Sequence, residues 1–163
     1  MKKILTLIAV FAASLLFTAN AEWRKSQVPF ADPYILVDGD YYYAYGTNHG
    51  DGIEVWRSTN LVGWEYMGLA LHKDNCTEKQ WFWAPEVYHK NGKYYMYYSA
   101  NEHLFVATGD SPTGPFYQQG GYQVQNILGS EKCIDSHVFF DDDGSACSFS
   151  HVLCLTSAFT LAG

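Results

Sequence analysis

The residues that could do chemistry in this chain are three carboxylates placed before similar stretches of sequence. Asp32, Glu86 and Asp135 stand 54 and 49 residues apart, and each comes just before a segment with the pattern of a strand, a turn and a second strand. Carboxylates exchange protons with substrate or water in acid–base catalysis. They can act together only if the fold brings them to one place, so we turn to the elements that would position them.

These elements form an imperfect repeat. Residues 31–45 and 84–98 each contain a two-residue turn, Asp38-Gly39 or Asn91-Gly92, between two strands rich in tyrosine. Both turns favour a type I′ hairpin, in which both central residues need a positive φ. A third, degraded copy begins at residues 134–144. Repeats of about 50 residues built from short strands are typical of propeller blades.

Each full repeat contains four predicted strands. After the hairpin come a third strand, at residues 53–57 or 104–108, a serine-containing turn and a fourth, aromatic strand. Four strands make one blade, and different blades approach the propeller axis from different sides. We therefore predict an all-β fold, a partial β-propeller of about two and a half blades, with the tyrosine runs 41–45 and 94–98 as core and cross-strand packing.

The third repeat breaks after Gly144. An aromatic strand is expected there, but residues 146–163 contain two of the four cysteines and no charged residue. The local pattern and the repeat disagree only at this point, which favours loss of the reading frame near residues 145–147. A natural short variant is the alternative. We expect residues 22–145 to form an incomplete propeller domain and residues 146–163 an aberrant tail.

The first 21 residues have the pattern of a secretory signal peptide. Lys2 and Lys3 precede an apolar run at residues 4–17, and Ala19-Asn20-Ala21 fits the small-x-small cleavage rule. The run is too short to cross a membrane as a helix. A buried N-terminal helix is the alternative. The pattern predicts an exported protein, periplasmic or extracellular, with no membrane partner after cleavage of the signal.

Composition narrows the classes of partner. A formal net charge of −7 argues against nucleic acid, whose phosphates favour a basic face, and is compatible with a neutral ligand such as a sugar. The cysteines at 76, 133, 147 and 154 contain no CxxC pair, so a zinc site has no support. A Cys76–Cys133 disulfide and free buried thiols are the two alternatives. We expect no metal and no cofactor.

Taken together, the motifs resemble glycoside hydrolase family 43. Four segments carry the resemblance, which covers residues 28–145: Ala-Asp-Pro-Tyr at 31–34, Trp-Ala-Pro-Glu-Val at 83–87, Ser-Pro-Thr-Gly-Pro-Phe at 111–116, and Cys133-Ile134-Asp135 with Phe-Asp-Asp-Asp-Gly at 140–144. One such motif alone is weak evidence, but four in order are specific.

The resemblance implies a five-bladed propeller whose axial pocket hydrolyses arabinose- or xylose-containing plant polysaccharides with inversion. Asp32 would be the general base, and Asp135 would orient the general acid and raise its pKa. Relatives carry that acid, a Glu, in a Glu-Gly-Pro context, and this sequence contains no such motif. Ser136 also stands where many relatives have Pro. We therefore expect this chain to be inactive on its own.

Further residues near these motifs have two explanations each. Trp83 could stack on a sugar ring or fill space between blades. Asn48 and His49 follow the first hairpin and are candidates for binding substrate, although a lone His in a loop is more often plain surface. Glu86 is predicted to be a structural hydrogen-bond partner or a rim residue, and not the acid. The acidic run 141–143 suits a solvated turn.

Three functional hypotheses remain. The first is an exported glycosidase of the arabinofuranosidase, xylosidase or arabinanase kind. In it Asp32 is a catalytic residue, instead of the turn or strand-start residue that its place before Pro33 would suggest. The second is a non-catalytic carbohydrate-binding propeller fragment. The third is a non-functional gene relic, whose open blade edges would be exposed and favour self-association.

Overall fold

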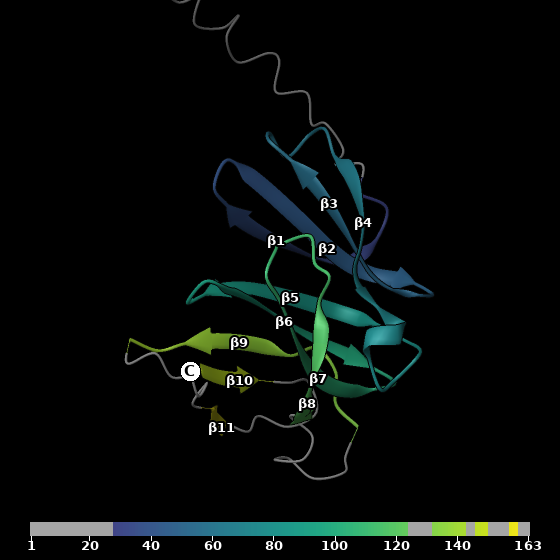
Figure 1. The fold of residues 1–163 in the computed structure, drawn as a ribbon, viewed down its shortest axis with the longest axis vertical. Coiled ribbons are helices and arrows are strands. Elements are labelled where there is room, and N and C mark those ends of the chain that lie inside the picture. Colours follow the sequence, from purple (N-terminus) through teal and green to yellow (C-terminus); the bar gives the residue numbers. More distant parts are fainter. Residues whose placement is uncertain (1–27, 124–131, 143–145, 150–156, 160–163) are drawn as a thin grey trace, which may run out of the picture.

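The fold consists of antiparallel sheets that lie one after another along the long axis of the molecule (Figure 1). The computed structural model describes residues 28–123, 132–142, 146–149 and 157–159. The first sheet (blade 1) has the strand order β1-β2-β3-β4, the second (blade 2) β5-β6-β7-β8, and the third (blade 3) β11-β10-β9. The predicted all-β fold, a partial propeller, is confirmed.

The element bounds are as follows. Blade 1 contains β1 (Ala31–Asp38), β2 (Tyr41–His49), β3 (Gly52–Ser58) and β4 (Glu65–His72), followed by the 3-10 turn η1 (Lys73–Asn75). Blade 2 contains β5 (Trp83–Lys90), β6 (Lys93–Ala100), β7 (His103–Gly109) and β8 (Tyr117–Gln123). Blade 3 contains β9 (His137–Phe140), β10 (Ala146–Phe149) and β11 (Ser157–Phe159). Within the described ranges, no helix has the length and apolar character needed to cross a membrane.

Two-residue turns join the first two strands of blades 1 and 2. In blade 2, Asn91 and Gly92 both have a positive φ, 52° and 74°, as the type I′ prediction requires. In blade 1 the prediction is wrong by one residue. The ladder closes at Asp38, so the central residues are Gly39 and Asp40, and of these only Gly39 has a positive φ. Glycine at the first central position is the pattern of a type II′ turn.

Strand pairing defines how blade 1 corresponds to blade 2. Ala31 pairs with Thr47, and Trp83 pairs with Ser99, so equivalent residues lie 52 positions apart (83 − 31 and 99 − 47). In both blades the register shifts immediately after this first pair. The two hairpins therefore share an interruption at the same place, next to the first residue of the blade.

This correspondence corrects the spacing of the carboxylates. The residue of blade 2 that is equivalent to Asp32 is Ala84, and Glu86 is equivalent to Tyr34, two positions further along the strand. Asp32 and Glu86 stand 54 residues apart, but they are not counterparts. Strand pairing, and not the order of acidic residues, defines which residues of the two blades correspond.

The middle blade is buried on both faces. Along β6, Tyr94, Met96 and Tyr98 belong to the cluster shared with blade 1, whereas Tyr97 belongs to the cluster shared with blade 3. This alternation follows from the two-residue period of a strand. A strand buried on both faces needs no polar side, which explains the continuous aromatic run. The largest fully buried side chains of the first cluster are Tyr45, Tyr98, Phe82, Phe105, Phe116 and Ile53.

The loop that precedes β8 reaches back from blade 2 to blade 1. The Tyr45 hydroxyl donates to the carbonyl oxygen of Pro112 at 2.5 Å, and the backbone N–H of Phe116 donates to the carbonyl oxygen of Ala70 at 2.8 Å. Gly114 has a φ of +79°, and a Cβ at this residue would lie 2.3 Å from the Ala70 oxygen. The glycine is needed because β4 passes so close.

A polar cluster connects the hairpin end of β1 to blade 2. The Tyr94 hydroxyl donates to Oδ2 of Asp38 at 2.6 Å, and Nδ1 of His89 lies 3.3 Å from Oδ1 of the same carboxylate. Burial and the hydrogen bond to Asp38 raise the pKa of Tyr94 to about 12. The neutral hydroxyl is therefore the stable form in the folded state, and it holds β1 against β6.

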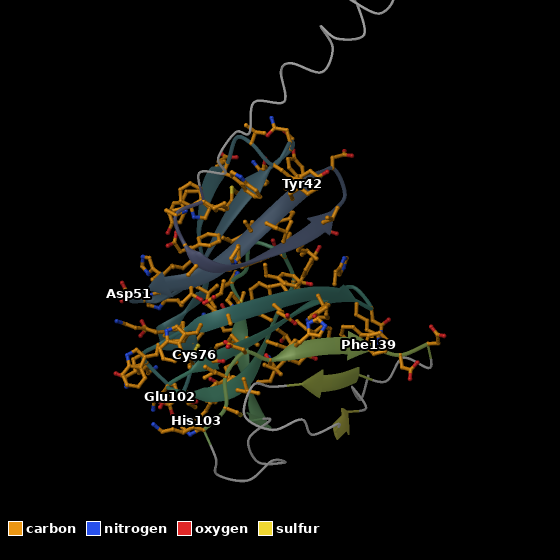
Figure 2. The ribbon with its side chains drawn as sticks, turned by 180° about the vertical axis from the view of Figure 1, so that it is seen from behind. Tyr42, Asp51, Cys76, Glu102, His103 and Phe139 are labelled. Atoms are coloured by element: carbon orange, nitrogen blue, oxygen red, sulfur yellow. The ribbon has the colours of Figure 1, made fainter. Side chains whose placement is uncertain are left out.

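Of the two alternatives left open for Cys76 and Cys133, the structure does not contain the disulfide. Cys76, labelled in Figure 2, has a free thiol and lies in the cluster between blades 1 and 2. Cys133 is buried in the other cluster, between blades 2 and 3. Burial raises the pKa of the Cys76 thiol, which keeps it in the less reactive protonated form. The side chain of Cys147 and all of Cys154 lie outside the described residues.

Backbone pairing in blade 3 continues across the place where the sequence repeat breaks. β10 pairs antiparallel with β9, and β11 pairs antiparallel with β10. The residue types of β10 depart from the repeat, but its place in the sheet is that of the second strand of a blade. Loss of the reading frame stays a prediction, because strand pairing does not test it. Residues 143–145 lie outside the described residues.

Replacement of Gly114 by alanine should destabilise the contact between blades 1 and 2. Its positive φ disfavours any other residue, and the new Cβ would clash with the Ala70 carbonyl oxygen. We expect a loss of about 2 kcal/mol or more in the free energy of unfolding, measured by urea denaturation. Gly50→Ala is the matched control, since nothing lies within 4 Å of a Cβ there. Equal stability of the two variants would contradict this account of the loop.

Stability should fall as the pH rises from about 10 to about 12. Burial raises the pKa of Tyr97 to about 12, the value reached also by Tyr94. An unfolded tyrosine ionises near pH 10. The folded pKa values are therefore raised, so this part of the stability is complete below pH 10 and is lost as the pH passes through 12.

Urea unfolding at several pH values between 8 and 12 measures this dependence. The double variant Tyr94→Phe/Tyr97→Phe should show a flatter fall, because neither phenylalanine can ionise. Tyr66→Phe, at an exposed position on β4, should keep the slope of the unmodified chain. If the slope is the same in all three proteins, these two buried hydroxyls are not its source.

Candidate active site

Three residues in three blades share an unusual backbone conformation. Asp32, Ala84 and Asp135 have φ values of 48°, 41° and 56°. Positive φ is uncommon outside glycine, and the strain persists only where surrounding contacts hold it. Each residue stands at the beginning of the first strand of its blade or two positions before it. The predicted catalytic residues, Asp32 and Asp135, thus occupy the same structural position in blades 1 and 3.

A threonine connects the first two of these residues. Oγ1 of Thr47 donates to Oδ2 of Asp32 at 2.7 Å and accepts the backbone N–H of Ala84 at 3.0 Å. Thr47 is buried near the end of β2, whereas Asp32 is exposed. The carboxylate of Asp32 is therefore held at the junction of blades 1 and 2 and remains open to solvent.

A serine makes the equivalent connection to blade 3. Ser99, the counterpart of Thr47, accepts the backbone N–H of Asp135 at 3.3 Å. Ser99 is fully buried and Asp135 is exposed. Asp32 and Asp135 therefore lie at successive blade junctions, with Ala84 between them in the order of blades.

The sequence departure at Ser136 has a structural consequence. Ser136 is buried, and its hydroxyl has no hydrogen-bond partner within the described part of the chain. A buried hydroxyl without a partner is unfavourable, and a proline side chain would not carry that penalty. The residue is next to Asp135, so this departure lies directly at the candidate site.

Two tryptophans stack beside Ala84. Trp83 is half-buried, and its ring stacks on that of Trp81 with 5.8 Å between centroids and 14° between planes. Trp81 is 48% exposed, whereas Phe82 between them is buried in the core. Phe82 thus fills the space between blades, and the outer ring of the stack belongs to Trp81. Sequence reasoning missed Trp81, although a second tryptophan two residues before Trp83 was visible in the sequence.

The other two predicted binding residues lie just after Thr47. Nδ1 of His49 accepts the backbone N–H of Asp51 at 3.1 Å, so only Nε2 is left to reach a ligand. The side chain of Asn48 lies outside the described residues. Substrate binding by Asn48 and His49 stays a prediction.

Glu86 connects blade 2 to blade 3. Its Oε2 accepts the backbone N–H of Val138 at 3.2 Å and lies 2.7 Å from the Tyr88 hydroxyl, and its Oε1 lies 3.0 Å from Nδ1 of His137. The side chain is 18% exposed. These contacts agree with the structural hydrogen-bonding role expected for Glu86.

The remaining acidic residues form no metal centre in the described ranges, where no group of three or more His, Cys, Asp or Glu side chains could hold an ion. In the acidic run, Oδ1 of Asp141 accepts the backbone N–H of Asp142 at 2.7 Å, and both residues are exposed. This is the geometry of a solvated turn. Asp143 lies outside the described residues.

The chain is similar to known polysaccharide-degrading enzymes in sequence. Residues 26–150 match the family described as Glycosyl hydrolases family 43. The chain is 32% identical over 156 residues to the extracellular exo-alpha-(1->5)-L-arabinofuranosidase ArbA of Cellvibrio japonicus, covering 82% of this chain and 43% of that protein. It is 26% identical over 160 residues to the extracellular endo-alpha-(1->5)-L-arabinanase 1 of Bacillus subtilis, covering 84% and 49%. The chain thus spans less than half the length of these two curated relatives.

Solved structures agree with this similarity. An endo-1,4-beta-xylanase from Bacteroides thetaiotaomicron superposes with a TM-score of 0.67 at 41% identity, covering 75% of this chain and 42% of the other. An endo-arabinase from the same species superposes with a TM-score of 0.66 at 29% identity, covering 76% and 45%. The family match, which extends over most of the sequence, and the shared blade geometry lead to one conclusion: this chain belongs to family 43 of the glycosyl hydrolases.

Proposed function

We propose that this chain carries the base-bearing part of an exported glycosidase that hydrolyses arabinose- or xylose-containing polysaccharides with inversion. One observation carries the proposal: Asp32 and Asp135 occupy the same strained backbone position in blades 1 and 3, and both are exposed. The names of the relatives, which include an arabinofuranosidase, arabinanases and a xylanase, support the substrate class. Two of those relatives are named extracellular, which supports export.

In the proposed mechanism Asp32 is the general base. Thr47 donates a hydrogen bond to Oδ2 of this carboxylate. A water beside the other oxygen, Oδ1, could lose a proton to it while attacking the anomeric carbon. A general acid on the opposite side of the sugar would protonate the leaving oxygen, and the two carboxyl groups must stand about 6.5–9.5 Å apart. Asp135 would orient that acid and raise its pKa by the repulsion of like charges.

The same mechanism implies that this chain does not cleave glycans by itself. The sequence contains no Glu-Gly-Pro segment that could supply the acid by resemblance to the family. Glu86, at the position equivalent to Tyr34, hydrogen-bonds to residues of blade 3 and does not take the place of the missing acid. A leaving group that departs as a stable anion needs no general acid, however, so a base alone could act on an activated substrate.

A second candidate function is carbohydrate binding without cleavage. The stacked pair Trp81 and Trp83 presents an exposed aromatic face beside Ala84, at the junction that also holds Asp32. Aromatic faces of this kind bind the apolar face of a sugar ring. This hypothesis needs no second carboxyl group.

Substrates that differ only in their leaving group test the role of Asp32. We expect the purified protein to leave arabino- and xylo-oligosaccharides intact. The expected inactivity applies to substrates whose leaving group needs a general acid. Fluoride departs without protonation, so the protein should release it from α-L-arabinofuranosyl or β-D-xylosyl fluoride above the background rate. Asp32→Asn should remove this release, since an amide cannot accept the proton. The measurement is fluoride release with an ion-selective electrode.

Asp141→Asn is the matched control, because it removes an exposed carboxylate from a turn outside the candidate site. It should release fluoride as the unmodified chain does. Oligosaccharide cleavage that depends on Asp32 would show that the chain holds its own acid. If neither substrate reacts, the general base is not functional here and the binding hypothesis takes precedence.

The binding hypothesis predicts that Trp81→Ala weakens the affinity for arabino- or xylo-oligosaccharides about tenfold, as expected from the loss of one stacked ring. Isothermal titration with each oligosaccharide measures this. Tyr66→Ala is the matched control, since Tyr66 is similarly exposed and also packs against a tryptophan, Trp56. Equal weakening in the two variants would show that Trp81 is no specific platform.

A further inference from the structure

The two hydrogen bonds of Thr47 determine where its hydroxyl proton lies. The backbone N–H of Ala84 can only donate, so Oγ1 must act as acceptor at that 3.0 Å contact. An ionised Asp32 can only accept, so the single hydroxyl proton faces its Oδ2 at 2.7 Å. The direction of the bond to Asp32 is thus set by a backbone group of the next blade.

The hydroxyl of Thr47 is itself held rigidly. Thr47 is 9% exposed and pairs with Ala31, the residue before Asp32. Its branched Cβ restricts χ1, so the hydroxyl has few alternative positions. Asp32, in contrast, is exposed, and an exposed carboxylate would otherwise sample several rotamers. A fixed donor beside a mobile acceptor limits the orientation of the acceptor.

A comparison of Thr47 with Ser99, its counterpart in blade 2, shows which of the two hydrogen bonds of Thr47 recurs in another blade. Ser99 accepts an N–H from blade 3 just as Thr47 accepts one from blade 2. The residue equivalent to Asp32 in the blade of Ser99 is Ala84, which has no carboxylate. The contact between blades is therefore common to both hydroxyls, whereas the bond to a carboxylate is specific to Thr47.

We propose that Thr47 is a positioning residue for Asp32, which holds the carboxylate in one orientation relative to blade 2. The catalytic value of this orientation rests on the proposed role of Asp32 as general base. A base that is already oriented needs no rearrangement before it accepts a proton, and small misplacements of reacting groups are costly in rate. The orientation itself is a property of the folded chain and can be measured without substrate.

The test compares Thr47→Val with Thr47→Ser in protein labelled with 13C at the aspartate carboxyl carbons. Valine keeps the shape of threonine but removes the hydroxyl, and serine keeps the hydroxyl. We expect the Asp32 carboxyl resonance, assigned by its loss in Asp32→Asn, to shift in Thr47→Val and to keep its position in Thr47→Ser. Ser99→Ala is the matched control. It should leave the Asp32 resonance unchanged, because the residue that corresponds to Asp32 in the blade of Ser99 is Ala84, which has no carboxylate.

A reciprocal measurement avoids any loss of folding in Thr47→Val. Asp32→Asn changes an exposed side chain, and it should shift the Thr47 Cβ resonance while leaving that of Ser99 in place. The proposal is overturned if Asp32→Asn leaves Thr47 unchanged, or if Ser99→Ala moves the Asp32 resonance as much as Thr47→Val does. Because no substrate is present, a failure to release fluoride would contradict the proposed function and not this inference.

Discussion

The hydrogen bond from a backbone N–H of one blade to a hydroxyl of the preceding blade is the interaction on which the rest of this structure depends. In the part of the chain that the structure describes it occurs twice, from Ala84 to Thr47 and from Asp135 to Ser99. Each donor has a positive φ, a strain of about 1–3 kcal/mol that needs compensating contacts. The buried hydroxyl supplies such a contact, and it would itself be unfavourable without a partner. The strained backbone conformation and the hydrogen bond therefore depend on each other, and together they determine how successive blades meet.

Apolar packing and polar contacts have different roles at these junctions. The free energy of association between blades comes from buried aromatic side chains such as Tyr98, Phe82 and Phe105, because burial of apolar area has no preferred direction and is large. Directional bonds at the two ends of β1, through Thr47 at one end and Tyr94 at the other, determine how the blades are oriented. The same distinction applies to the candidate site. The apolar core stabilises the blades around it, and the hydroxyl of Thr47 orients Asp32.

The architecture could be predicted from the sequence because the interactions that form its hairpins act between residues close together in the chain. Alternating aromatic residues around Asn91-Gly92 and Gly39 predict hairpins, since a strand's two-residue period and the positive φ of such turns act over a few residues. Asp32 and Asp135 were accessible through the motifs around them. Even here, the position of the first turn was wrong by one residue, because the ladder continues to Asp38 and only pairing between strands decides where it closes.

The sequence by itself determined the class of fold, the blade repeat, the family and the two aspartates proposed for the site. Only the tertiary structure decided that Ala84, and not Glu86, is the counterpart of Asp32, that Thr47 bonds both, and that Trp81 is the exposed ring of the stack. The physical reason is that these relations depend on register between strands and on contacts between blades, which join residues far apart in the chain. A positive φ at an alanine has no local signature, because the bond that stabilises it comes from a hydroxyl 37 residues away.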